Sequence, residues 1–216
     1  MAGFFISFEG GEGAGKTTQI GLLSKALQAR GHTVLCTREP GGTPEAEKIR
    51  DLLVKQGGGV WHPEAELLLL FAARKQHVEH LIRPALTEGH IVITDRFTDS
   101  TRAYQGAGQG IDPEKIERLN TLVLGNFAPD LTFVLDMDPA AGLVRARDRL
   151  ARETPDSQTA EDRFERLDLS FHERLRAGFL EIARKSPHRC VVLSAAQAQT
   201  TLSAEIEAQV MGRLEG

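Results

Sequence analysis

Gly10-Gly11-Glu12-Gly13-Ala14-Gly15-Lys16-Thr17 matches the pattern Gly-x-x-x-x-Gly-Lys-Thr. The stretch follows the apolar run Phe4 to Phe8 and opens a helical pattern in which Ile20, Leu23 and Leu27 share one face. Glycines in such a strand-to-helix turn let successive backbone N–H groups point at phosphate oxygens, and the helix N-terminus adds a positive partial charge. The pattern therefore predicts a loop that binds the phosphates of a nucleotide.

The end of this loop supplies the groups that phosphate chemistry needs. Lys16 is expected to neutralise the β and γ phosphates, and the Thr17 hydroxyl is expected to join the shell of a Mg²⁺ ion. Asp95 ends an apolar strand and is our candidate for holding a water of that ion. Asp136 ends another apolar run in the same way, so the pattern alone leaves the two carboxylates as competitors.

Apolar runs alternate with helical patterns along the whole chain. Buried strands of a parallel sheet have this composition, and helices between them imply that both faces of the sheet are covered. The sequence therefore predicts a single α/β domain over residues 1–216. The expected strands are Phe4 to Phe8, Thr33 to Cys36, Ile91 to Thr94, Leu131 to Leu135 and Cys190 to Leu193.

The bulk composition excludes several classes of protein. The net charge of -4 gives no general basic field for nucleic acid or an acidic membrane, so anionic substrates need local positive charge. No apolar run approaches the length that spans a membrane. The two cysteines, Cys36 and Cys190, lie far apart in short apolar runs and are expected to be buried strand residues, which fits a reducing cytoplasm.

Two classes of nucleotide-binding protein remain, a small-molecule kinase and a nucleotide-gated switch. A GTP switch needs Asn-Lys-x-Asp to read guanine and Asp-x-x-Gly to sense the γ-phosphate, and the sequence contains neither. Arg38 and Arg96 follow the second and third expected strands, so both should emerge at the carboxyl edge of the sheet, where a second phosphorylated ligand could bind. These features favour the kinase.

Four segments resemble the bacterial thymidylate kinase family, and the resemblance extends over nearly the whole chain. They are Phe8-Glu9-Gly10-Gly11-Glu12-Gly13-Ala14-Gly15-Lys16-Thr17-Thr18, Arg38-Glu39-Pro40-Gly41-Gly42-Thr43, Leu70-Phe71-Ala72-Ala73-Arg74 and Asp95-Arg96-Phe97-Thr98-Asp99-Ser100-Thr101-Arg102-Ala103-Tyr104-Gln105-Gly106. The resemblance implies a P-loop NTPase-type three-layer α/β/α fold with a five-stranded parallel sheet. It further implies a homodimer that transfers the γ-phosphate of ATP to dTMP.

The resemblance also implies which residues hold each nucleotide. Glu12 is expected to turn toward the sugar of dTMP, Arg74 to donate to the 4-carbonyl of thymine, and Tyr104 to crowd the 2′-position. Phe71 is expected to stack on the base, although an aromatic residue in an apolar helix stripe is also an ordinary core residue. The ATP-binding set is Gly10, Gly11, Glu12, Gly13, Ala14, Gly15, Lys16, Thr17 and Thr18; the dTMP-binding set is Glu12, Arg38, Phe71, Arg74, Arg96, Ser100, Tyr104 and Gln105.

A polar stretch from Arg152 to Asp162 follows a helical pattern rich in arginine. It resembles the lid of the bacterial subclass, whose phosphate loop has glycine at the position of Gly13, so we expect a mobile lid at about residues 147–163. Arg147 and Arg149 are then expected to act in catalysis together with Lys16 and Arg96. The alternative for any one lid arginine is a solvated helix face of alternating charge.

His77 and His80 share a helix face, which is one requirement of a metal site. No third ligand has a suitable spacing, so both are interpreted as surface histidines.

Overall fold

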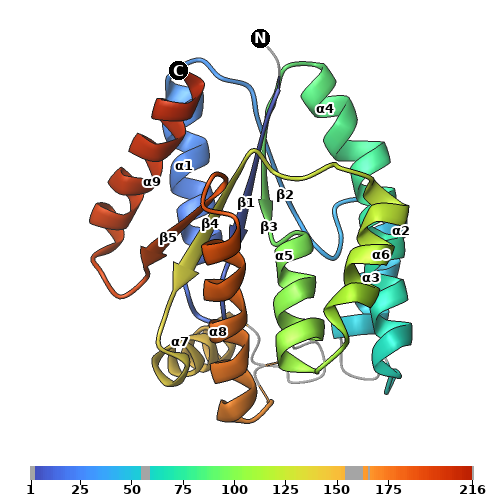
Figure 1. Cartoon of the computed structure of the whole chain (residues 1–216). Helices are drawn as coiled ribbons and strands as arrows, with labels where there is room; N and C mark the ends of the chain where they lie inside the picture. The colour runs from blue at the N-terminus through green and yellow to red at the C-terminus, as the bar shows by residue number, and fades with distance from the viewer. Residues whose placement is uncertain (1–2, 55–58, 154–162, 165, 216) are drawn as a thin grey trace.

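A computed structural model describes residues 3–54, 59–153, 163–164 and 166–215. Its five strands form one parallel sheet in the order β2-β3-β1-β4-β5, and all four neighbouring pairs are parallel. In Figure 1 the strands point toward a common lower edge, which is therefore the carboxyl edge of the sheet. The strands are β1 (Phe4–Glu9), β2 (Val34–Arg38), β3 (Ile91–Asp95), β4 (Leu131–Asp136) and β5 (Cys190–Ser194).

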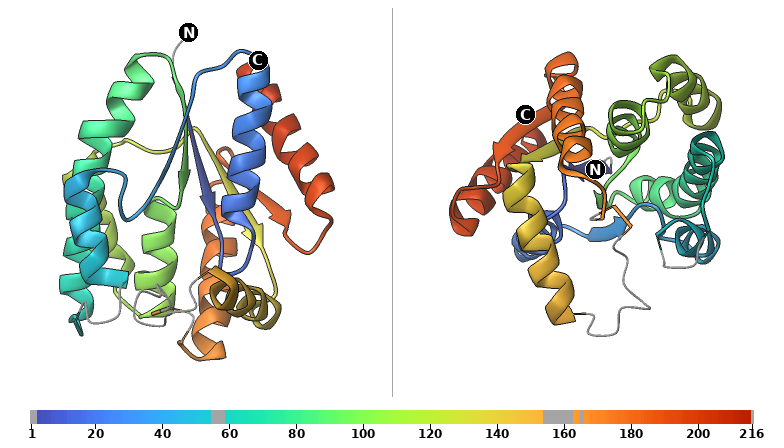
Figure 2. Two further views of the ribbon diagram at one scale, coloured as in Figure 1. Left: turned by 180° about the vertical axis from the view of Figure 1, so that it is seen from behind. Right: turned by 90° about the horizontal axis from the view of Figure 1, so that it is seen from below.

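Helices connect the strands and cover both faces of the sheet, so the expected three-layer α/β/α architecture is confirmed (Figure 1). Figure 2 shows α1 and α9 together on one side. The helices are α1 (Lys16–Ala29), α2 (Pro44–Val54), α3 (Pro63–His77), α4 (Arg83–Thr87), α5 (Thr98–Thr101), α6 (Pro113–Leu124), α7 (Pro139–Glu153), α8 (Leu169–Lys185) and α9 (Gln199–Leu214), with π-helical turns η1 (Val78–Ile82) and η2 (Arg102–Gly108).

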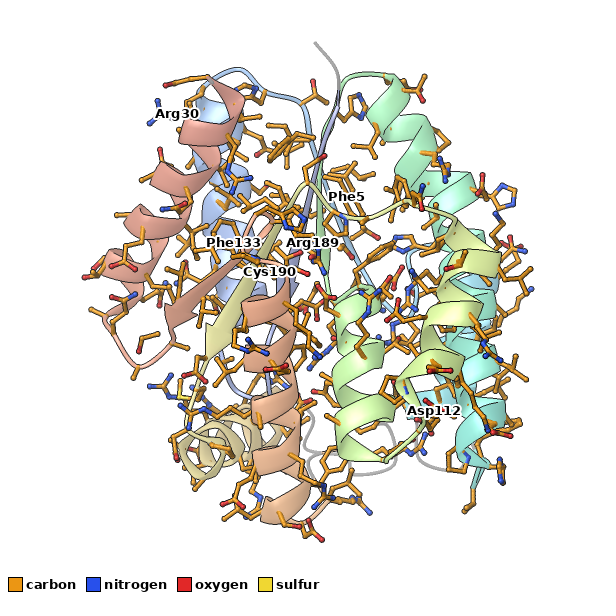
Figure 3. The ribbon with its side chains drawn as sticks, in the orientation of Figure 1. Phe5, Arg30, Asp112, Phe133, Arg189 and Cys190 are labelled. Atoms are coloured by element: carbon orange, nitrogen blue, oxygen red, sulfur yellow. The ribbon has the colours of Figure 1, made fainter. Side chains whose placement is uncertain are left out.

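The alternation of side chains along β1 divides the core into two halves. Ile6 and Phe8 are fully buried against α1 and α9, whereas Phe5 packs on the other face with Phe97, whose ring meets it edge-on at 5.0 Å. Figure 3 shows Phe5 and Phe133 in the middle of the molecule. A sheet buried on both faces in this way leaves its carboxyl edge as the surface where polar side chains gather.

The environment of one of the two cysteines differs from expectation. Cys190 is buried at the start of β5, but Cys36 is exposed because β2 is an edge strand whose side chains are only partly covered. The prediction that Cys36 is buried was therefore wrong. Within the described residues no helix is at once long enough and apolar enough to cross a membrane.

The segment expected to form a lid is described only in part. Residues 147–153 lie in α7, and Arg163 and Phe164 are described beyond it. The polar stretch between them, residues 154–162, lies outside the described residues.

Candidate active site

The phosphate loop wraps tightly between β1 and α1. Gly10, Gly13 and Gly15 all have positive φ, and a Cβ on Gly13 would lie 2.0 Å from the carbonyl oxygen of Gly142 on α7. Lys16 is buried and its Nζ donates to the carbonyls of Gly10 (3.2 Å) and Gly11 (3.0 Å). Its pKa is lowered by burial and by Arg96 nearby. The lysine thus lies along the loop where phosphate oxygens would replace those carbonyls as partners.

The carboxylates that end β3 and β4, Asp95 and Asp136, differ in their hydrogen-bond partners. Thr17 Oγ1 donates to Asp95 Oδ2 at 3.0 Å, and Asp95 Oδ1 is buried with no hydrogen-bond partner among the described residues. Asp136 instead accepts two bonds from Arg176, at 2.6 and 2.8 Å. An uncommitted carboxylate oxygen beside a threonine hydroxyl fits the oxygen ligands that Mg²⁺ prefers, so this geometry favours Asp95.

Arg96 connects the phosphate loop with Ser100, which follows β3. It is the one described residue other than glycine with positive φ (71°), and its backbone N–H donates to Phe8. Its Nη1 donates to the Gly10 carbonyl (3.0 Å) and to Ser100 Oγ (3.2 Å), and its Nη2 donates to Glu12 (3.0 Å). A strained backbone held by so many contacts is typical of a functional position.

Glu12 and Tyr104 lie next to this arginine. The Tyr104 hydroxyl donates to Glu12 at 2.5 Å, and the guanidinium of Arg96 lies 4.8 Å from the centre of the Tyr104 ring. Burial alone would raise the pKa of Glu12, but Arg96 and Lys16 outweigh it and lower the pKa to about 2. The same Glu12 charge raises the pKa of Arg96, which is otherwise depressed by its burial. Both groups therefore stay ionised at neutral pH.

Glu9 anchors the same cluster from below, a role that the sequence analysis missed. Its carboxylate is fully buried and accepts from the Phe97 backbone N–H (2.8 Å) and from Ser100 Oγ (2.6 Å). Burial and the neighbouring charge of Asp99 raise the pKa of Glu9 to about 8. A carboxylate directly after the apolar run Phe4 to Phe8 was the signal that could have revealed it.

This raised pKa predicts how stability depends on pH. The folded protein binds a proton at Glu9 that the unfolded chain releases near pH 4.5, so the contribution is full below that pH and disappears as pH rises through about 8. We expect the free energy of unfolding of the wild type to fall over this window relative to Glu9→Gln, which cannot titrate. Urea titrations of both proteins at pH 5.5 and pH 8.5 measure it; equal pH slopes would contradict the prediction.

Arg74 of α3 is buried among residues that follow β2 and β3. Its side chain is 3% exposed, and its Nε donates to Glu39 at 2.7 Å. Nη2 donates to Thr101 Oγ1 (3.0 Å) and to the carbonyl of Phe97 (3.3 Å), while Nη1 is buried and has no partner in the described part of the chain. Since a buried unpaired donor is costly, this nitrogen is a ready contact for a ligand acceptor.

The other expected dTMP-binding residues are engaged in different ways. Phe71 is 2% exposed and packs with Leu67, so the apolar stripe that contains it serves the core. Gln105 donates to the buried carboxylate of Glu66 at 2.8 Å. Arg38 is half exposed at the edge of the sheet, where it pairs with Glu47 at 3.0 Å. Of these three, none contacts Arg96 through a described hydrogen bond.

The two histidines of α3 and η1 differ sharply in exposure. His80 is exposed, as expected, but His77 is fully buried, so the interpretation of His77 as a surface residue was wrong. Its ring bonds to Glu39 (3.0 Å) and to Thr37 (2.7 Å), which satisfies both nitrogens inside the protein. Among the residues that the structure describes, no three His, Cys, Asp or Glu side chains gather as a metal site.

Arg147 and Arg149 are exposed on α7, which packs its Gly142 against the phosphate loop. Arg145 on the same helix instead donates to the Ala195 carbonyl at 3.2 Å. The helix that carries the two candidate arginines therefore contacts the phosphate loop through Gly142, and residues 154–162 that follow it lie outside the described residues.

A phosphate loop with a buried lysine, joined by the guanidinium of Arg96 to Ser100 after β3, is the arrangement of a P-loop phosphotransferase. The family model described as thymidylate kinase matches residues 8–206, and the chain belongs to the thymidylate kinase family.

Relatives of known name agree with this family. A thymidylate kinase of Caulobacter vibrioides is 51% identical over 212 residues, 98% of both chains, and one of Geobacter sulfurreducens is 52% identical over 192 residues, 88% of both. The crystal structure of a thymidylate kinase from Ehrlichia chaffeensis matches with a TM-score of 0.76 at 38% identity, covering 99% of this chain and 100% of that one. These matches confirm the P-loop NTPase-type fold.

Proposed function

We propose how the residues of this site carry out the reaction of the family. The chain is a dTMP kinase (EC 2.7.4.9) that transfers the γ-phosphate of ATP to dTMP, giving dTDP and ADP for dTTP synthesis. The observation that carries the residue-level account is Arg96, whose Nη1 donates to the Gly10 carbonyl of the phosphate loop and whose Nη2 donates to Glu12. One guanidinium therefore adjoins both nucleotide sites.

On the donor side, residues 10–18 bind the ATP phosphates. The Lys16 ammonium leaves the carbonyls of Gly10 and Gly11 and neutralises the β and γ phosphates. Thr17 and Asp95 would hold Mg²⁺, which would supply charge neutralisation at the phosphates. Oδ1 of Asp95, which has no partner in the described part of the chain, supports this assignment.

On the acceptor side, Arg96, Ser100 and Arg38 hold the phosphate of dTMP, for which Arg38 must exchange its exposed partner Glu47. Glu12 and Tyr104 contact the sugar, and their mutual hydrogen bond fixes both groups at its edge.

The thymine base lies between Phe71, Arg74 and Gln105. Phe71 lies 5.1 Å from the Arg74 guanidinium, so the ring that stacks on the base and the donor that reads it come from one helix face. The buried packing of Phe71 supports a rigid wall rather than a mobile one.

Catalysis in this account consists of positioning and charge neutralisation. The attacking oxygen of dTMP already carries negative charge, so no general base has to create the nucleophile. Arg147 and Arg149 of the lid would approach the γ-phosphoryl group, where charge is redistributed during transfer.

Neutralising a lid arginine should lower turnover more than it weakens dTMP binding. We expect Arg147→Gln or Arg149→Gln to reduce kcat by at least about ten-fold with a smaller change in KM, because a closing lid meets charge that develops during transfer. Steady-state kinetics measure this, with Arg118→Gln on α6, where the arginine is 81% exposed, as the control. If neither lid substitution changes kcat, the arginines form a solvated face.

We also propose a homodimer in the cytoplasm that takes neither nucleic acid nor membrane as a partner. Leu68 on α3 is 56% exposed and Leu122 on α6 is 80% exposed, and these two helices pack together through Leu67 and Ile116. Exposed leucines on neighbouring helices support a face that a second copy of the chain covers. Light scattering on the purified chain measures the mass in solution.

The substrate assignment is tested by ADP release across a panel of nucleosides and nucleoside monophosphates. We expect phosphorylation of dTMP far above the other acceptors. Equal use of several monophosphates would support only a nucleoside monophosphate kinase without a preference for dTMP. GTP hydrolysis without an acceptor would favour a switch protein.

A further inference from the structure

The guanidinium of Arg74 is fixed on every side except one. Glu39 accepts from Nε, and Thr101 with the Phe97 carbonyl accepts from Nη2. The rings of Phe71 and Phe97 lie 5.1 and 5.4 Å from its central carbon. A plane held at two edges and flanked by two rings cannot rotate without breaking several contacts, so Nη1 is presented in one direction.

Glu39 is itself held by a second buried group. Its other carboxylate oxygen lies 3.0 Å from Nδ1 of His77, whose Nε2 lies 2.7 Å from Thr37 Oγ1. A carboxylate only accepts, so Nδ1 carries a proton, and in the neutral ring Nε2 then accepts from the Thr37 hydroxyl. Hydrogen bonds thus connect Thr37 to His77 and His77 to Glu39. The other carboxylate oxygen of Glu39 accepts from Nε of Arg74.

The backbone packs closely around these hydrogen-bonded side chains. Gly42 has φ of 87°, and a Cβ there would lie 2.5 Å from the His77 ring and 2.6 Å from Thr37 Oγ1. The backbone N–H of Glu39 donates to the carbonyl of Asp95 at the end of β3. His77 and Glu39 are 0% and 4% exposed, so water does not compete for their hydrogen bonds.

We propose that Glu39 and His77 are positioning residues for base selection, acting through Arg74. They hold Nη1 where a pyrimidine with an acceptor at its 4-position gains a bond and one with an amino group meets donor against donor. This inference rests on the proposed contact of Arg74 with the base. Once the guanidinium is released, it can turn away from an amino group, so dCMP loses its penalty while dTMP loses an aligned partner.

The ratio of kcat/KM for dTMP to that for dCMP tests the proposal. We expect His77→Ala to lower this ratio about ten- to a hundred-fold, through a higher KM for dTMP at nearly unchanged kcat. His77→Asn should recover most of the ratio, since its amide nitrogen is attached where Nδ1 is and can donate to Glu39. The matched control is Ser7→Ala, which breaks a buried hydroxyl pair with Thr132 inside the sheet and should leave the ratio unchanged.

The outcomes distinguish the contact of Arg74 with the base from the positioning of Arg74 by Glu39 and His77. A wild-type ratio in Arg74→Ala overturns the contact between Arg74 and the base. A lost ratio in Arg74→Ala with a wild-type ratio in His77→Ala overturns the positioning role alone, and an equal loss in His77→Asn and His77→Ala does the same. If His77→Ala does not fold, Thr37→Val, which removes the donor to Nε2 and keeps the side-chain shape, is measured in its place; a wild-type ratio there also overturns the role.

Discussion

Lys16→Ala is expected to lower turnover by about three decades while leaving a folded protein. The lysine charge would neutralise the phosphates during transfer, and a group of this kind contributes about 4 kcal/mol to the transition state. Among the residues that the structure describes, its Nζ bonds the two loop carbonyls of Gly10 and Gly11, and the side chain takes no part in the apolar core. Turnover at saturating ATP and dTMP measures the loss.

The control for this variant is Lys25→Ala, which removes an exposed lysine from the same helix. It should change neither turnover nor the thermal midpoint appreciably. Circular dichroism of Lys16→Ala should match the wild type, since the loop keeps its glycine geometry. Near wild-type turnover of Lys16→Ala at saturating ATP would mean that the phosphate-loop assignment of Lys16 is mistaken.

The sequence predicted the sheet and the phosphate loop because both depend on local patterns. All five expected strands exist, with ends shifted by one or two residues at most, because buried parallel strands consist of short continuous apolar runs. Asp112 and Asp138 cap α6 and α7 in the same local way, with the side chain of each accepting a backbone N–H in the first turn. Such features need only neighbours in the chain.

Contacts between distant segments could not be predicted in the same way. His77 was assigned to the surface because only its spacing from His80 was considered. Its partners Thr37 and Glu39 lie in β2 and directly after it, far from His77 in the sequence. A useful signal was present: His77 follows Arg74 by three residues and directly precedes the buried Val78, so two polar residues share the apolar side of a helix. Polar residues in that position need partners, which points to a buried network.

The roles of individual ligand-binding residues stay predictions because several of them are engaged with other protein groups. Arg38 pairs with Glu47, and Gln105 pairs with Glu66. Arg96 and Ser100 meet in the structure, where Nη1 of Arg96 donates to Ser100 Oγ, a contact that the sequence analysis did not predict. Preferring Asp95 to Asp136 required the structure, in which Thr17 donates to Asp95 whereas Arg176 donates twice to Asp136.

Selection of thymine is expected to depend on the buried Nη1 of Arg74, which has no partner among the described residues. Arginine can only donate hydrogen bonds, and thymine presents a carbonyl at its 4-position where cytosine presents an amino group. A bound cytosine would leave two donors facing each other in a desolvated pocket, which is penalised by about three decades or more. Uracil differs from thymine by one methyl group, so its rejection should be only roughly ten- to two-hundred-fold.

The expected order of kcat/KM is therefore dTMP, then dUMP, then dCMP far behind, and steady-state kinetics on the three acceptors measure it. In Arg74→Ala the gap between dTMP and dCMP should shrink to about ten-fold or less, because no donor is left to oppose the amino group. The gap between dTMP and dUMP should persist, since a methyl group is read by shape and not by Arg74. Loss of both gaps together would indicate a collapsed pocket, and efficient use of dCMP by the wild type would refute both the substrate and the role of Arg74.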